Sequence, residues 1–345
     1  MGGRLFVIGA SLSGIDALSR LMGQLPADFP APIFIAQHVA PHSPGLLPHI
    51  LSQAGPLPAV HPKAADLIQA GRVYVAPPDR HMLIEDGYVK LSHGPHENLA
   101  RPAIDPLFRS AAVAYGPAVV GVVLTGQLDD GTAGLLAIKD RGGTTIVQDP
   151  AEATASSMPR SALQHVPVDH CLGLDDMAAL LVMLANDDPA NQERSSFEKL
   201  MEIENRIAAG IFSVDDWWNL EQMSAPSGLN CPTCRSALYE VKDSRVLRFR
   251  CRSGHAFSAQ SLLSGQTDAR EMLLSCLFGA AIEEATLAKR MLTLPAYREH
   301  PAVADGLSSR VDLLEREAAQ VSEWLHATTG LVAPESDMRA PPVTG

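Results

Sequence analysis

Four residues of metal-binding type lie close together in the last third of the chain. Cys231 and Cys234 form a C-x2-C pair, and after sixteen further residues Cys251 and His255 form a C-x3-H pair. Three thiolates and one imidazole complete a tetrahedral structural zinc site and leave no open position for a catalytic water. The spacing therefore predicts one structural Zn²⁺ bound by all four side chains.

A second candidate is Ser11, which follows the apolar run Leu5–Ile8 and precedes a segment, 15–22, with helical periodicity. At such a turn, backbone N–H groups and the positive end of the helix dipole stabilise developing negative charge. Three interpretations fit. Ser11 is a nucleophile, or it caps the helix, or Gly9 and Gly14 mark a nucleotide-binding turn.

The elements that would position such residues alternate between strand and helix. Over residues 1 to about 185 this alternation predicts a mostly parallel sheet with helices on both faces, and sites in such sheets form at the carboxyl ends of the strands. A second apolar strand ends at His38, where a nucleotide site would need an acidic residue, and the apolar run Ala118–Leu124 precedes Asp130. Ser11, His38 and Asp130 are thus candidates for a nucleophile, a base and an orienting carboxylate.

These residues belong to a series of motifs that resembles the chemotaxis-type protein-glutamate methylesterases, the CheB family. The resemblance covers roughly residues 4–185, a little over half of the chain, and many separated blocks make it specific. The blocks occur in the family's order: Ile8–Gly14, Gln37-His38, Val75–Asp79, Arg101–Asp105, Leu124–Gly126 with Asp130-Gly131, and Gln148–Pro150 with Met158-Pro159.

The resemblance implies a three-layer α/β methylesterase domain over residues 1–186. It implies a serine hydrolase that removes γ-methyl esters from glutamates of chemoreceptors and often deamidates their glutamines, with no cofactor for catalysis. Carried over by motif, Ser11 is the nucleophile, His38 the base and Asp130 the orienting aspartate, and the N–H of Gln127 contributes to the oxyanion hole. The implied partner is a methylated chemoreceptor-like protein.

The sequence departs from the family pattern at two places. Leu12 and Ser13 stand where the family often has Thr and Gly, and Leu128 and Asp129 stand where it commonly has Gly and Asn. Leu128 restricts the backbone of its loop, and we expect Asp129 to be a solvated charge. These substitutions support the alternative hypothesis of a catalytically degenerate signalling scaffold that binds partners through its C-terminal part.

The composition of the remaining chain predicts further parts. A polar stretch begins at residue 187, and we expect a linker and a helix over 187–227. A zinc-ribbon-like module is expected over 228–258, and a helical hairpin, a candidate site for a signalling partner, over 259–330. The tail, 331–345, is predicted to be disordered.

The ribbon carries arginines in near alternation, at 245, 248, 250 and 252. They form either a basic face for an acidic partner or a solvated edge that resists aggregation, and we favour the edge. Since the ribbon is too small to bury much apolar surface, its folding should depend on the metal. The α/β domain should keep its own core, so Ser11 should stay reactive without zinc.

Composition and charge exclude several classes of protein. The 345 residues carry a net charge of −12, which argues against general nucleic-acid affinity. No apolar run reaches the length of a membrane span, so no membrane insertion is expected. Because the first strand starts so early, we expect neither a signal peptide nor a receiver domain before it. Five cysteines, three of them clustered, argue against a disulfide framework, and we expect a cytoplasmic protein.

Overall fold

The computed structural model describes residues 3–187, 198–242 and 245–328, which fall into two compact units that meet at Leu263 and Ser264. The first unit contains the sheet and the ribbon, and the second contains most of the helical hairpin. The predicted disordered tail, most of the polar stretch that begins at residue 187, and the turn at 243–244 lie outside the described residues.

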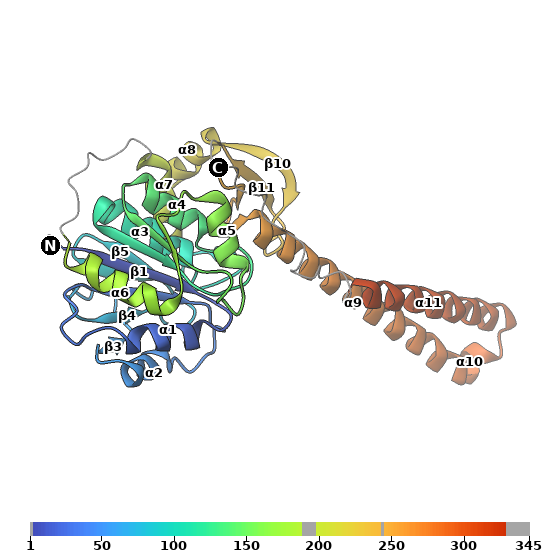
Figure 1. The fold of residues 1–345 in the computed structure, drawn as a ribbon. Coiled ribbons are helices and arrows are strands. Elements are labelled where there is room, and N and C mark those ends of the chain that lie inside the picture. The colour runs from blue at the N-terminus through green and yellow to red at the C-terminus, as the bar shows by residue number, and fades with distance from the viewer. Residues whose placement is uncertain (1–2, 188–197, 243–244, 329–345) are drawn as a thin grey trace, which may run out of the picture. The chain divides into compact units, whose positions relative to one another are not determined.

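A seven-stranded parallel sheet forms the centre of the first unit (Figure 1), as the alternating pattern predicts. The strand order is β3-β4-β2-β1-β7-β8-β9. Because β1 pairs with β2 on one side and β7 on the other, the chain reverses its direction of winding at β1, and sites in such sheets form at this switch point. The strands are β1 (Leu5–Ala10), β2 (Ile33–Gln37), β3 (Ala59–Val60), β4 (Val73–Val75), β7 (Val119–Val123), β8 (Thr144–Gln148) and β9 (His170–Leu172).

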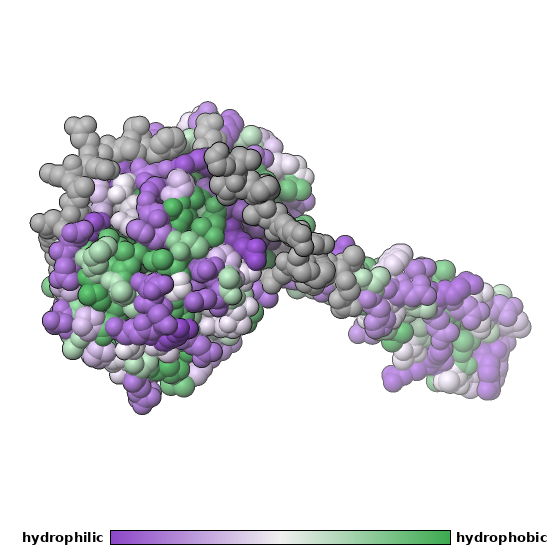
Figure 2. Space-filling view, viewed as in Figure 1, coloured by the Kyte–Doolittle hydropathy of each residue, from purple (hydrophilic) through white to green (hydrophobic). Residues whose placement is uncertain are grey.

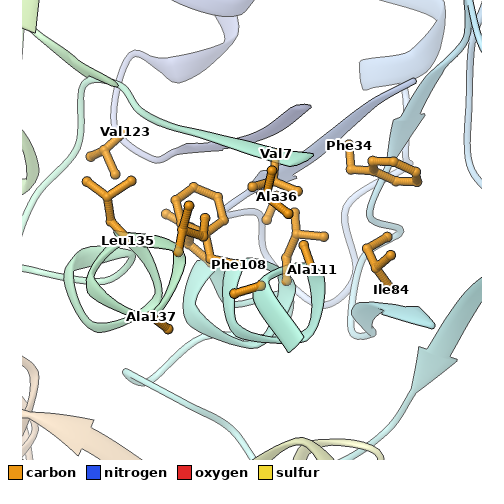
Figure 3. Close-up of a cluster of buried hydrophobic side chains, with 14 of the residues drawn as sticks. Val7, Phe34, Ala36, Ile84, Phe108, Ala111, Val123, Leu135 and Ala137 are labelled. Atoms are coloured by element: carbon orange, nitrogen blue, oxygen red, sulfur yellow. The ribbon is translucent and has the colours of Figure 1, made fainter. Parts of the chain in front are cut away.

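Helices cover both faces of this sheet. On one face α1, α2 and α6 pack over a cluster that includes Phe6, Ile8 and Leu18. On the other face α3, α4 and the β5–β6 hairpin pack over Val7, Phe108 and other apolar side chains (Figure 3), and the short η1 (Gly116–Ala118) leads into β7. The elements are α1 (Gly14–Gly23), α2 (Leu47–Ala54), β5 (His81–Glu85), β6 (Tyr88–Ser92), α3 (Ile104–Tyr115), α4 (Thr132–Asp140), α5 (Ser157–His165) and α6 (Leu174–Ala185).

The segment expected to be a linker with one helix contains two helices, α7 (Glu198–Ala208) and α8 (Val214–Gln222). Ser213 and Asp216 form a capping box at the start of α8. Leu220 on α8 packs on Ile203 and Ile207 of α7 in a small apolar cluster. This cluster and the capping box explain why a segment that looks like a linker is helical.

The ribbon is a four-stranded antiparallel sheet that begins at Ser224, ahead of the predicted start at residue 228. Its strands are β10 (Ser224–Asn230), β11 (Ala237–Val241), β12 (Arg248–Cys251) and β13 (Ala256–Ser258). Leu238, Phe257 and Leu262 form a small core together with Cys231 and Cys251.

The ribbon belongs to the same compact unit as the parallel sheet. Arg250, only 2% exposed, forms ion pairs with Glu97 and Glu204. The interpretation of the ribbon arginines as a solvated edge is therefore wrong for Arg250. Two carboxylates from outside the ribbon compensate its charge, and an alternating pattern within the ribbon could not reveal them.

The second unit contains two long antiparallel helices, as the periodicity predicts. α9 (Ala259–Thr293) begins in the first unit, and α10 (Pro295–Arg298) and α11 (Pro301–Thr328) follow. Small side chains, including Ala281 and Ala285, let the helices pack closely around Leu314. The hairpin surface is mainly hydrophilic with scattered apolar residues (Figure 2). Among the described helices, none has the length and apolar character needed to cross a membrane.

Candidate active site

The structure brings together the three residues that the strand ends predict. Ser11 follows β1, His38 follows β2, and Asp130 lies in the loop after β7. Ser11 Oγ lies 3.1 Å from His38 Nδ1, and His38 Nε2 lies 2.7 Å from Asp130 Oδ2. The His38 side chain is 21% exposed and that of Asp130 is 3% exposed. A partly exposed base beside a buried carboxylate is the arrangement that a hydroxyl nucleophile needs.

The two other interpretations of the first turn do not fit this geometry. The residue that precedes α1 is Ser13, while the Ser11 hydroxyl lies against His38. A Cβ at Gly9 would lie 2.3 Å from Ile104, and a Cβ at Gly14 would lie 2.1 Å from an oxygen of Gln37. Both glycines thus serve close packing within the protein, and neither marks a phosphate-binding surface.

Main-chain contacts hold the nucleophile and the base. The Ser11 amide donates to the carbonyl of Thr125 at 3.0 Å, and the His38 amide donates to the carbonyl of Ala10 at 3.1 Å. The Gln37 side-chain amide donates to the carbonyls of Ser11 at 2.7 Å and His38 at 2.9 Å. Gln37 therefore fixes both loops at once. The sequence signal for this role is a polar residue that ends an otherwise apolar strand.

Asp130 lies at the N-terminus of α3, where unpaired amides point toward it. The Ile104 amide donates to Oδ2 at 2.7 Å, and the Asp105 amide donates to Oδ1 at 3.2 Å. The side chain of Asn98 also donates to Oδ1, at 2.8 Å. Burial opposes ionisation, but the hydrogen bonds from His38, Ile104 and Asn98 outweigh it, so the pKa of Asp130 lies below its usual range. The carboxylate is therefore charged and ready to orient His38.

Asp105 is a second buried carboxyl group beside Asp130. It accepts hydrogen bonds from the amides of Gly131 at 3.1 Å and Gly134 at 2.6 Å, and from Asn98 at 2.8 Å. Burial and the neighbouring charge of Asp130 raise the pKa of Asp105 to about 8. The sequence identifies Asp105 only as the end of a family motif and the start of a helix.

Asp129 corrects the expectation of a solvated loop charge. It is 5% exposed, and its carboxylate accepts hydrogen bonds from the Ser258 hydroxyl and, at 3.2 Å, from the Gln260 amide. Burial raises the pKa of Asp129 above its usual range, although these two hydrogen bonds act to lower it. Asp129 looks exposed in the sequence because its partners lie about 130 residues further along the chain.

The predicted oxyanion loop passes directly over the nucleophile. A Cβ at Gly126 would lie 2.8 Å from the Cβ of Ser11. Gln127 is exposed, and its amide has no hydrogen-bond partner among the described residues. Leu128 adopts a left-handed backbone with φ 61°, which is a strained conformation for a leucine. A leucine thus occupies a left-handed backbone position for which Gly is better suited.

The four predicted metal ligands also come together. Their ligand atoms all lie within 4.8 Å of one another. The Sγ atoms of Cys234 and Cys251 are 3.6 Å apart, and His255 Nδ1 lies 3.8 Å from Cys231 Sγ and 3.5 Å from Cys251 Sγ. Ligands at the zinc–sulfur distance of about 2.3 Å on a tetrahedron are separated by roughly 3.8 Å. The donor set therefore fits a tetrahedral zinc ion.

A hollow of about 370 Å³ lies beside His38, lined among others by Pro41, His96 and Leu99. Arg101 also lines it, and its guanidinium pairs with Asp79 at 2.6 Å. The partly exposed side chain of His38 thus borders an open hollow.

Comparisons with known proteins agree with this geometry. The CheB methylesterase family model matches residues 6–181. A relative from Leptospira interrogans is 41% identical over 179 residues, which are 52% of this chain and 93% of that protein. The protein-glutamate methylesterase FrzG of Myxococcus xanthus is 37% identical over 52% of this chain and 54% of its own length.

A solved structure shows the same fold. The CheB methylesterase catalytic domain of Thermotoga maritima matches with a TM-score of 0.52 and 30% sequence identity, and the match covers 53% of this chain and all of that domain. The predicted α/β class with a mostly parallel sheet is thereby confirmed. This chain therefore belongs to the CheB methylesterase family.

Proposed function

We propose that this chain is a serine esterase that hydrolyses γ-methyl esters of glutamate side chains on a chemoreceptor-like protein and deamidates glutamines in the same position. The observation that carries the proposal is the Ser11–His38–Asp130 arrangement, with 3.1 Å and 2.7 Å between the interacting atoms. The methylesterase and glutaminase names of relatives such as that from Anaeromyxobacter dehalogenans, 42% identical over 175 residues, support this substrate class.

The hydrogen bonds of His38 support a role for each ring nitrogen. In the proposed tautomer the Nε2–H group donates a hydrogen bond to Asp130, so Nδ1 accepts the proton of the Ser11 hydroxyl. Ser11 Oγ attacks the γ-carbonyl carbon, and the proton held at Nδ1 passes to the departing methanol or ammonia. Water then attacks the acyl-enzyme with His38 again as base, which releases glutamate and restores the hydroxyl.

The loop after β7 would stabilise the oxyanion that forms in this reaction. The amide of Gln127, which has no partner among the described residues, lies in the loop that covers Ser11 and would donate to the negative oxygen of the tetrahedral intermediate. A preorganised donor at this position contributes about 10²- to 10³-fold to the rate. The substrate segment would enter through the hollow of about 370 Å³ beside His38.

The proposal includes one structural zinc ion held by Cys231, Cys234, Cys251 and His255, whose donor spacing fits a tetrahedral ion. The ion would stabilise the ribbon and take no part in the reaction. The proposed location is the cytoplasm, because thiolate ligands survive in a reducing compartment. The binding of a signalling partner to the helical hairpin stays a prediction.

The direct test is methanol release from a receptor fragment that carries glutamate γ-methyl esters. The wild-type protein should release methanol, and the Ser11→Ala variant should release it at the uncatalysed rate. Equal rates for the two proteins would refute the serine esterase. The hypothesis of a degenerate scaffold gains no support from the site, because the three side chains are in hydrogen-bonding reach and Leu128 keeps the left-handed backbone.

A further inference from the structure

The ribbon pairs with a loop that lies beside the candidate active site. The Asn98 amide donates to the carbonyl of Ala256 at 2.9 Å, and the Ala256 amide donates to the carbonyl of His96 at 3.2 Å. Ala256 directly follows the predicted metal ligand His255. The loop 96–98 is therefore joined, strand-like, to the segment that leaves the predicted metal site.

Asn98 connects this pairing to the catalytic loop through its side chain. On one side its Nδ2 donates to Asp130 Oδ1 and to Asp105 Oδ2, both at 2.8 Å. On the other side its Oδ1 accepts from the Ser258 amide at 2.8 Å and from the hydroxyl of Ser261 at 2.9 Å. With carboxylates on one side and donors on the other, only one orientation of the amide satisfies its partners.

A second contact joins the same elements independently. Asp129 accepts from the Ser258 hydroxyl and the Gln260 amide, so its carboxylate caps the first turn of α9. A negative charge at a helix N-terminus also interacts favourably with the helix dipole. Asp129 is thus hydrogen-bonded directly to Ser258 at the end of the ribbon, and Asp130 is connected to the same residue through Asn98.

A buried group of charges holds the ribbon next to Asn98. Glu97 pairs with Arg109 of α3 at 2.9 Å and with Arg250 of the ribbon at 3.2 Å. Glu204 of α7 pairs with Arg250 at 3.2 Å and with Arg248 at 3.0 Å. Burial opposes ionisation of both glutamates, but the arginines outweigh it and lower their pKa values. Loss of one partner would leave a buried charge uncompensated, so the five side chains bind the ribbon firmly in this position.

We propose that Asn98, Ser258 and Ser261 are positioning residues of the esterase, through which the ribbon holds Asp130 in the orientation that His38 requires. The inference rests on the proposed function, because it takes Asp130 as the residue that orients His38. The path is short: the Ser258 main-chain amide and the Ser261 hydroxyl fix the side-chain amide of Asn98, and its N–H fixes Oδ1 of Asp130. Oδ2 of Asp130 is then directed at His38 Nε2.

The inference predicts that these residues affect the chemical step and leave substrate binding unchanged. Asn98 borders the hollow beside His38 but is only 7% exposed, and none of the three residues forms the Ser11 or Gln127 part of the site. Removing the Asn98 side chain should lower kcat by about ten- to a hundredfold, and Ser261→Ala should lower it by about three- to tenfold. KM should stay within about twofold of the wild-type value in both variants.

The experiment measures kcat and KM for methanol release from the methylated receptor fragment with four proteins: the wild type, Asn98→Ala, Ser261→Ala and the double variant. If the serine acts through Asn98, the double variant should be no slower than Asn98→Ala alone. Ser227→Ala is the matched control, because that ribbon hydroxyl donates to the carbonyl of Leu238 and has no part in the path. Its kcat should equal that of the wild type.

Thermal unfolding and zinc content are measured on the same samples, so that a loss of folded protein is not mistaken for a loss of positioning. Unchanged kcat in Asn98→Ala, or losses that multiply in the double variant, would overturn the inference. In either case a wild-type protein that is active and loses activity in Ser11→Ala leaves the proposed function intact. A wild-type protein that releases no methanol would instead refute the proposed function itself.

Discussion

Ser11 and Asp130 lie at the same edge of one sheet, but different parts of the chain hold them. The turn of Ser11 is fixed from within the α/β fold, by the carbonyl of Thr125 and the side chain of Gln37. The loop of Asp130 is fixed by α3 and by Asn98, whose amide is itself held by Ser258 and Ser261 of the C-terminal part. The nucleophile side is therefore self-contained, while the aspartate side depends on a region outside the family domain.

The largest effect is expected on the nucleophile side. Ser11→Ala removes the attacking oxygen, so methanol release should fall by about ten-thousandfold or more. Ser19→Ala on α1 is the control and should keep full activity, because among the described residues its exposed hydroxyl donates to the carbonyl of Ile15 in the same helix. Substantial activity in Ser11→Ala would show that the nucleophile lies elsewhere.

A comparable loss is expected on the aspartate side. Asp130→Asn places an amide where His38 Nε2 now finds an acceptor, which favours the wrong tautomer and should lower kcat by about ten-thousandfold. Because triad members act together, Ser11→Ala combined with Asp130→Asn should be scarcely slower than Ser11→Ala alone. A loss below tenfold in Asp130→Asn would mean that His38 is oriented by another group.

The aspartate side should also respond to pH through a buried histidine. His81 Nδ1 accepts from the Ala103 amide at 3.3 Å, and Nε2 donates to the carbonyl of Pro95 at 2.9 Å, so the neutral ring joins the start of α3 to the loop before Asn98. Burial lowers the pKa of His81 from 6.5 to about 4, while Glu97 favours and Arg101 opposes its protonation.

The unfolded chain thus binds a proton at His81 below about pH 6.5 and the folded chain only below about pH 4. Stability should fall by about 3 kcal/mol as the pH drops from 7 to 4. Denaturant unfolding of the wild type and of His81→Gln at several pH values measures this effect. The variant should show a flatter dependence, whereas the exposed His49→Gln should match the wild type. Parallel curves for His81→Gln and the wild type would contradict the assignment.

Loss of the predicted zinc site tests the dependence of the aspartate side on the ribbon. In Cys231→Ser the ribbon should lose its metal and release Ser258 and Ser261, so methanol release should fall by about ten- to a hundredfold. Elemental analysis should find one zinc per chain in the wild type and in the control Cys276→Ser, whose thiol is exposed on α9. Full activity in a zinc-free Cys231→Ser would show that the ribbon is an independent module, as the sequence suggests.

The smallest effect is expected at the oxyanion loop. Leu128 has φ 61°, so Leu128→Gly should relieve backbone strain. Because Gly also increases the conformational entropy of the unfolded chain, the free energy of unfolding should rise by no more than about 1 kcal/mol. Leu128→Ala keeps the strain and serves as the comparison in the same denaturant titration. Marked destabilisation by Gly would mean that the leucine side chain stabilises the loop by its contacts.

The contrast between the two sides also explains which site residues can be predicted from the sequence and which cannot. Ser11, His38 and Asp130 can be predicted because each follows the carboxyl end of a strand of a parallel sheet, and the rule about strand ends needs only a local pattern. The cluster of three cysteines and His255 can be predicted because the spacing of these residues is local as well. Asn98 and Arg250 cannot, because their partners are distant in sequence and depend on how the ribbon packs.

Asp129 is the sharpest example of this limit. In the sequence it is one acidic residue in a polar loop, which ordinarily means a solvated charge. In the fold it caps a helix that starts about 130 residues later. The seven-stranded fold follows from alternating apolar runs, whereas the docking of the ribbon depends on buried polar contacts that hydrophobic periodicity does not register.

The most direct measurement of the central claim is the site of covalent labelling by a fluorophosphonate on the native protein. Intact mass and peptide mapping should find one adduct per chain, on Ser11, at a rate that falls in Asn98→Ala and in Cys231→Ser but not in Ser227→Ala. An adduct on another serine, or no adduct on a folded zinc-bound protein, would contradict the serine esterase. Equal labelling rates in all four proteins would contradict the role of the ribbon in positioning Asp130.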